Sequence, residues 1–114
     1  MMPKLSLIAV LLLAACGGGE TTEDLTGEQL AGEVGCLACH TDRDASAAPS
    51  LVGIWGTEVQ FSDGRTVTVD DEYVRRSITE PGADVVEGYN PIMPTFPLKD
   101  DEVDRLIDFV RSLG

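Results

Sequence analysis

The sequence is short of aromatic and basic residues. Only 5% of its 114 residues are aromatic, and 8 lysines and arginines stand against 20 aspartates and glutamates, which gives a net charge of -12. Because few large apolar side chains are available, a chain of this length should form one domain and need a disulfide, a metal or a cofactor to stabilise it. The acidic excess would repel a phosphate backbone, which argues against nucleic acid as a partner.

The sequence also lacks an apolar run that could cross a bilayer. Its longest run, residues 5–15, follows Lys4 and is much shorter than the roughly 20 residues that a membrane-spanning helix needs. A basic residue followed by a short apolar run is typical of a cleaved export signal. We therefore expect residues 1–15 to be a signal peptide and the protein to be exported.

Cys16 comes directly after this apolar run. The sequence Leu-Ala-Ala-Cys at residues 13–16 resembles the bacterial lipobox, in which a signal peptidase cuts before a cysteine that carries lipid. We predict a lipoprotein signal peptide, lipidation of Cys16 and anchoring to the membrane on the periplasmic or extracytoplasmic side, because several acyl chains anchor a protein stably. An ordinary signal peptide with an incidental cysteine is the alternative.

Residues 16–25 consist largely of glycine, threonine and acidic side chains. This composition predicts a flexible tether, and residues 26–114 then form the single domain. Loss of Lys4 with the signal peptide would make the charge more negative than -12. Such a surface indicates either a docking partner with a basic patch or adaptation to high salt.

The domain begins with a predicted helix and contains one predicted β-hairpin. Thr26 and Gln29 match a capping box at the start of the helix. Apolar and polar residues alternate on either side of Asp63 and Gly64 within residues 59–69. An Asp-Gly pair between two such runs is the usual signal for a tight hairpin.

Two further helices follow the hairpin. Asp70 is suited to cap the first of them, and Pro81 would end it. Apolar residues recur every three or four positions over residues 100–113, which predicts an amphipathic C-terminal helix. Lys99 precedes this helix, so we expect either Asp100 to cap it or its first turn to be looser.

Cys36, Cys39 and His40 form a C-x-x-C-H sequence. This spacing lets two thiols on one helical turn bond to the two vinyl groups of a haem while the next residue binds the iron. A thioredoxin-like dithiol and a zinc site are the alternatives. Zinc would lack ligands, because His40 is the one histidine and Cys16 the one remaining cysteine.

Met93 is the candidate for the second axial position of the iron. Met1 and Met2 would leave with the signal peptide, and the sequence has no second histidine. Met93 is followed by Pro94 and lies close to Pro91, in a segment too rich in proline to be helical. An extended segment could place the thioether over one face of the haem; simple packing in the core is the alternative role for Met93.

The sequence resembles a monohaem class I cytochrome c over most of residues 25–114, and residues 48–56 and 88–94 are similar to the cytochrome c domain fused to subunit II of haem-copper oxidases. The resemblance implies an all-α cytochrome c fold with a small β-hairpin insertion and one covalently attached haem c. It also implies that the carbonyl of Pro49 accepts a hydrogen bond from His40. It further implies that Trp55 packs near the haem propionates, although an ordinary core role for this aromatic is equally open.

Two axial ligands from the protein would leave the iron without an open position, which predicts electron transfer and not enzymatic catalysis. We expect a monomeric one-electron carrier of a respiratory chain that takes electrons from a quinol-oxidising complex and gives them to a terminal haem-copper oxidase. A cytochrome subunit of a dehydrogenase or oxidase complex is one alternative. A haem sensor, in which Met93 leaves the iron and a gas binds, is another.

Overall fold

The computed structural model describes residues 22–114. The expected signal peptide, the lipidation site Cys16 and most of the expected tether therefore lie outside the described residues. Within residues 22–114, no helix combines the length and the apolar character that a membrane span requires.

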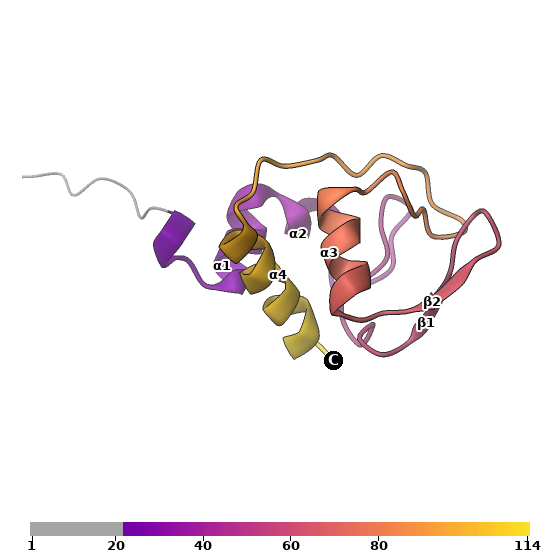
Figure 1. Ribbon diagram of the computed structural model, residues 1–114, viewed down its shortest axis with the longest axis horizontal. Coiled ribbons are helices and arrows are strands. Elements are labelled where there is room, and N and C mark those ends of the chain that lie inside the picture. Colours follow the sequence, from indigo (N-terminus) through magenta and orange to yellow (C-terminus); the bar gives the residue numbers. More distant parts are fainter. Residues whose placement is uncertain (1–21) are drawn as a thin grey trace, which may run out of the picture.

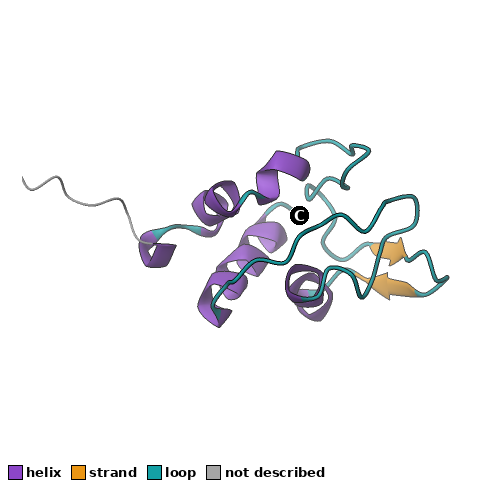
Figure 2. Ribbon diagram, turned by 90° about the horizontal axis from the view of Figure 1, so that it is seen from above, coloured by secondary structure: helices purple, strands orange, loops and turns teal. Residues whose placement is uncertain are grey.

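The described chain is mostly helical, with one two-stranded antiparallel sheet (Figure 1). This confirms the expected helical fold with a small hairpin. The elements in chain order are η1 (Thr22–Asp24), α1 (Gly27–Val34), α2 (Cys36–Cys39), β1 (Glu58–Gln60), β2 (Thr66–Thr68), α3 (Asp71–Thr79) and α4 (Asp100–Ser112). The strands lie at the opposite end of the domain from η1 and α1 (Figure 2).

The core forms where α1 and α3 pack against α4. Helix α4 supplies more of the core residues than any other element. Its apolar residues recur every three or four positions, so they lie on one side of the helix. The buried core residues are Leu25, Leu30, Ala31, Val69, Val74, Ile78, Val103, Leu106, Ile107 and Val110.

The starts of α1 and α3 and the hairpin agree with the sequence signals, whereas the start of α4 does not. Thr26 and Gln29 form the expected capping box on α1, and Asp70 accepts a hydrogen bond from the backbone N–H of Tyr73 at the start of α3. In the hairpin, Val59 pairs with Val67 across the strands, and the turn includes Gly64 at a φ of 90°. Only glycine adopts such a positive φ without strain.

The start of α4 differs from the sequence expectation. Lys99 is the N-cap residue, and its backbone N–H donates to the side chain of Glu102 at 2.9 Å. Of the two expectations, the cap by Asp100 is wrong: the buried side chain of Glu102 in the first turn accepts from the backbone of Lys99, which is one half of a capping box.

The end of the expected tether contacts the domain. Arg105 donates hydrogen bonds to the carbonyls of Thr22 and Leu25 at 2.7 and 2.6 Å, and Lys99 forms an ion pair with Glu23 at 3.1 Å. Residues 22–25 are thus held against α4, and Leu25 belongs to the core.

Gly27 allows α1 to approach the backbone of α4. A Cβ at this position would lie 2.2 Å from the carbonyl oxygen of Arg105 and 2.9 Å from the Cβ of Phe109. We expect Gly27→Ala to lower the free energy of unfolding by about 1–3 kcal/mol, the usual cost of overpacking. Urea denaturation of the haem-bearing protein measures this change.

Gly32 provides the matched control in the same helix. A Cβ there would have no neighbour within 4 Å, so Gly32→Ala should raise the free energy of unfolding by up to about 1 kcal/mol through helix propensity alone. Equal effects of the two substitutions would show that the close approach at Gly27 does not matter.

Candidate functional site

The C-x-x-C-H sequence forms a short helical turn immediately after α1. Gly35 ends α1 at a φ of 105°, and the chain then turns directly into α2, which spans the two cysteines. Cys36 is half-buried against the core, Cys39 is exposed, and both thiols are free. His40 follows as the C-terminal cap residue of α2.

A hydrogen bond from the loop fixes the imidazole of His40. Its Nδ1 lies 2.8 Å from the carbonyl oxygen of Pro49. A carbonyl can only accept, so Nδ1 carries the proton and Nε2 keeps its lone pair. The contact that the resemblance implied is present, and it leaves Nε2 able to bind a metal.

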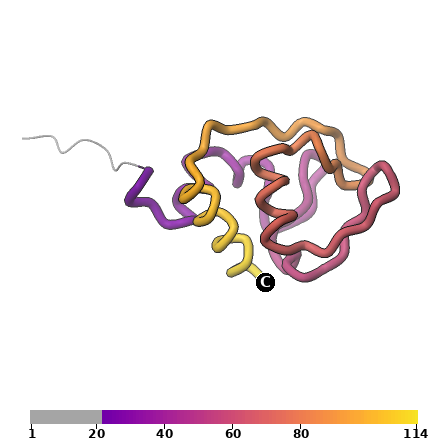
Figure 3. The backbone as a smooth tube through the Cα atoms, in the orientation of Figure 1, coloured from indigo at the N-terminus to yellow at the C-terminus, as the bar shows by residue number. Residues whose placement is uncertain are grey.

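Met93 lies on the same cavity as His40 although it is far from it in the chain. The methionine segment, residues 80–99, contains no helix or strand; it leaves the end of α3, reaches the hairpin and then returns to the start of α4 (Figure 3). It covers a cavity of about 190 Å³, which His40, Cys36 and Cys39 line together with Met93.

A second cavity of about 100 Å³ adjoins the first. Cys36, His40, Pro49, Tyr73, Ser77 and Met93 line both cavities. The smaller one reaches into the apolar core, where Leu106 and Val110 of α4 form part of its wall. The structure thus brings together five of the site residues that the sequence suggested: Cys36, Cys39, His40, Pro49 and Met93.

Trp55 lies elsewhere. It is partly buried against the core, beneath the guanidinium of Arg111, whose central carbon is 4.8 Å from the centre of the indole ring. Its backbone N–H donates to the carbonyl of Gly114 at 3.0 Å. The structure places Trp55 at the C-terminal end of α4 and outside the residues that line either cavity.

Burial raises the pKa of the Cys36 thiol, and a backbone hydrogen bond offsets this only in part. The thiol therefore stays protonated at neutral pH. Redox-active C-x-x-C motifs have a lowered pKa instead, so this environment does not favour a thioredoxin-like dithiol.

Zinc does not fit the side chains that surround His40. In residues 22–114, no group of three or more histidine, cysteine, aspartate or glutamate side chains is placed to hold a metal ion. A zinc ion here would lack the four ligands that structural sites provide.

The donor set fits a covalently bound haem. Two free thiols one turn apart, an imidazole with its Nε2 available and a thioether all face one cavity with mainly apolar walls. These are the groups that c-type cytochromes use to attach haem and to bind its iron.

Two further cavity residues were not expected from the sequence. Ser77 and Asp84 line the larger cavity, and Asp84 is paired with Arg76. Arg75, the neighbour of Arg76 in the chain, pairs instead with Asp104 on α4. Two neighbouring arginines thus form ion pairs with different parts of the fold, which their adjacency in the sequence does not indicate.

Fold and site together define a small helical electron-transfer protein that holds a haem through C-x-x-C-H. The family model for cytochrome c matches residues 25–114, and the chain belongs to the cytochrome c family. Members of this family carry covalent haem c and transfer electrons, so the protein is an electron carrier and not an enzyme. A comparison with curated proteins found no match.

Proposed function

We propose that the protein is a membrane-tethered monohaem cytochrome c that carries single electrons in a respiratory chain, from a quinol-oxidising complex to a terminal haem-copper oxidase. The observation that supports this most strongly is the meeting of Cys36, Cys39, His40 and Met93 on one cavity. The two thiols would attach one haem there, and His40 and Met93 would bind its iron.

Each residue has a defined task in this proposal. Haem c, when bound, supplies an iron that accepts and releases one electron. Cys36 and Cys39 would hold the group covalently, and the hydrogen bond to the carbonyl of Pro49 would keep Nε2 of His40 available to bind the iron. The thioether of Met93 would be the second protein ligand of the iron, where it would exclude small molecules and favour the reduced state.

The proposed tether rests on the sequence around Cys16, and the contacts of residues 22–25 indicate where it would leave the domain. Arg105 holds the carbonyls of Thr22 and Leu25, so the tether would leave the domain beside α4. A lipid on Cys16 would then keep the domain near its membrane partners, and tethering raises the local concentration that these partners encounter.

The surface charge fits a basic docking partner. Mutual attraction would speed the encounter between this acidic domain and a positively charged surface. The choice of a haem-copper oxidase as acceptor rests on the sequence resemblance of residues 48–56 and 88–94 alone.

Removal of the anchor tests the proposal. A chain that begins at Gly17 behind an ordinary cleavable export signal should carry haem but appear in the soluble periplasmic fraction. Oxidation of the reduced protein by isolated membranes should slow by about tenfold or more, because tethering gives effective concentrations near the millimolar range. The rate is measured by stopped-flow absorbance.

The full-length chain is the control, and mass spectrometry of its mature form should show acyl groups on Cys16. A mature chain without lipid, or equal oxidation rates for the two chains, would contradict the tethered carrier.

A further inference from the structure

A buried carboxylate stands in the wall of the haem cavity. Asp84 lies between α3 and the part of the methionine segment that contains Met93, and both residues line the larger cavity. Its side chain is only 5% exposed. A charge in such a position is held in a medium of low dielectric constant and acts strongly on its surroundings.

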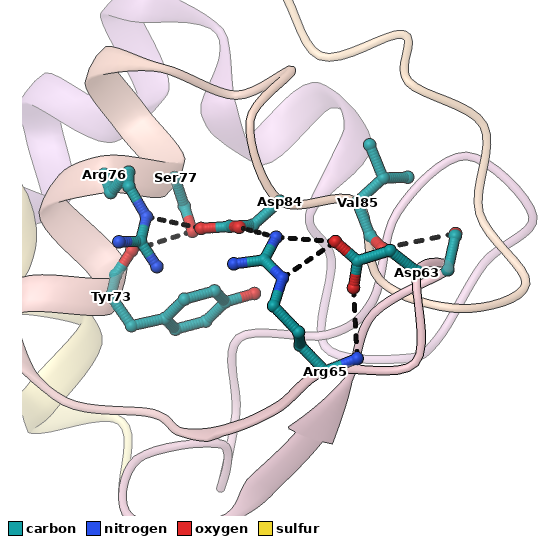
Figure 4. A network of polar contacts seen from close by, with 8 residues as sticks. Asp63, Arg65, Tyr73, Arg76, Ser77, Asp84 and Val85 are labelled. Carbon is teal, nitrogen blue, oxygen red and sulfur yellow. Dashed lines mark hydrogen bonds and ion pairs between the residues drawn. The ribbon is translucent and has the colours of Figure 1, made fainter.

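Two arginines from different elements meet on this carboxylate (Figure 4). Arg65, in the hairpin turn, lies 2.6 Å from Oδ1, and Arg76, on α3, donates from its Nε to Oδ2. Each oxygen therefore has its own cation. Arg65 is further paired with Asp63 at 2.7 Å, and these two side chains are each 53% exposed.

The two arginines differ in their exposure to solvent. The side chain of Arg76 is 34% exposed and that of Arg65 is 53% exposed. Solvent screens the more exposed charge more effectively, so Arg76 and Asp84 should dominate the field of this cluster inside the cavity.

Packing alone gives little reason for this cluster. A buried ion pair commonly contributes no more stability than apolar side chains of the same volume, because desolvation offsets the attraction. The neighbouring backbone is already fixed to the hairpin: the N–H of Ser62 donates to the carbonyl of Val85 at 2.8 Å, and that of Glu87 donates to Gln60 at 2.9 Å.

We propose that Asp84 and Arg76 shift the reduction potential of the bound haem in opposite directions, and that their pairing holds these two effects in balance. The inference rests on the proposed function, because it requires an iron in this cavity. The oxidised iron carries one more positive charge than the reduced iron. A nearby carboxylate therefore stabilises the oxidised state and lowers the potential, while a nearby guanidinium raises it.

The sign of the effect gives the test. In the haem-bearing protein, Asp84→Asn should raise the midpoint potential, and Arg76→Gln should lower it. The double variant should return close to the unmodified value, because both charges are gone. Potentials are measured by spectroelectrochemical titration, and the methionine charge-transfer band of the ferric state reports whether Met93 is still bound.

A surface ion pair that also involves an arginine of α3 provides the matched control. Arg75 on α3 pairs with Asp104 on α4, and these side chains are 40% and 58% exposed. Arg75→Gln and Asp104→Asn should move the potential by less than about half as much, because water screens exposed charges. Arg65→Gln, with its more exposed side chain, should lower the potential by less than Arg76→Gln.

Three results would overturn the inference. One is a shift of both Asp84→Asn and Arg76→Gln in the same direction with a weakened methionine band, because the cluster would then only hold the methionine segment. The second is a shift no larger than that of the control pair. The third result applies if the Asp84 variant fails to fold: the midpoint potential is then unchanged by both Arg76→Gln and Arg65→Gln. An unmodified protein without a methionine band would refute the proposed ligands instead.

Discussion

Met93→Ala is expected to open the iron to small molecules and to lower the reduction potential. The thioether favours reduced iron, and water or hydroxide in its place favours oxidised iron. The fall should be on the order of 0.1 V, a fraction of the roughly 0.8 V over which axial ligands set haem potentials. The ferric methionine band should disappear, and the ferrous protein should bind carbon monoxide.

Met93→Leu separates ligation from packing. Leucine fills a similar volume without a sulfur atom, so the band should be lost and carbon monoxide should bind, while the core keeps more of its stability than in Met93→Ala. Ile92→Ala removes a neighbouring side chain that is 60% exposed and should leave the band unchanged. An unaltered spectrum in both Met93 variants would contradict our ligand assignment.

The unmodified protein distinguishes a carrier from a sensor in the same measurements. A carrier should keep its ferrous spectrum under carbon monoxide, because Met93 would then leave the iron no position at which the gas can bind. Spectral change in the unmodified protein would favour the gas sensor over the electron carrier.

Local signals in the sequence predicted most of the fold. Thr26 with Gln29, and Asp70 alone, identify two helix starts because a side chain caps the backbone only three residues away. Asp63 and Gly64 identify the hairpin because the turn needs a positive φ. The start of α4 was misread, since Lys99 cannot cap with its own side chain and the relevant signal was Glu102 three residues later.

The site likewise contains residues that local sequence signals predict and residues that they do not. Cys36, Cys39 and His40 are adjacent in the chain, so their spacing predicted the haem site directly, and Met93 followed by elimination. Asp84 could not be predicted, because its partners Arg65 and Arg76 meet it only after the hairpin and α3 have packed together. The resemblance to known cytochromes did not predict that Trp55 lies against Arg111.

The contacts of residues 22–25 show the same limit. Composition alone favours a flexible tether up to residue 25. Arg105 is 80 residues away from Leu25 in the chain, and nothing in the composition of the tether indicates that this side chain holds its carbonyl. Long-range hydrogen bonds of this kind depend on how α1 and α4 cross.

Conversion of both Cys36 and Cys39 to serine should release the haem from covalent attachment and reduce the stability of the domain. Haem should no longer migrate with the chain on a denaturing gel. Any haem still bound would stabilise the fold only by mass action, so the melting temperature should rise with added haem, whereas that of the unmodified protein should not.

The two single substitutions should differ because the thiols differ in burial. Cys36 packs against the core, and its replacement by serine places a hydroxyl in apolar surroundings, which costs about 1–3 kcal/mol when the group lacks a hydrogen-bond partner. Cys39 is exposed, so Cys39→Ser should lose one thioether with little further cost. Ala38→Ser, on the exposed residue between them, is the control and should keep both attachments. Equal losses of stability in Cys36→Ser and Cys39→Ser, measured by urea denaturation, would mean that burial of the Cys36 side chain does not contribute and that the covalent bonds alone set the effect.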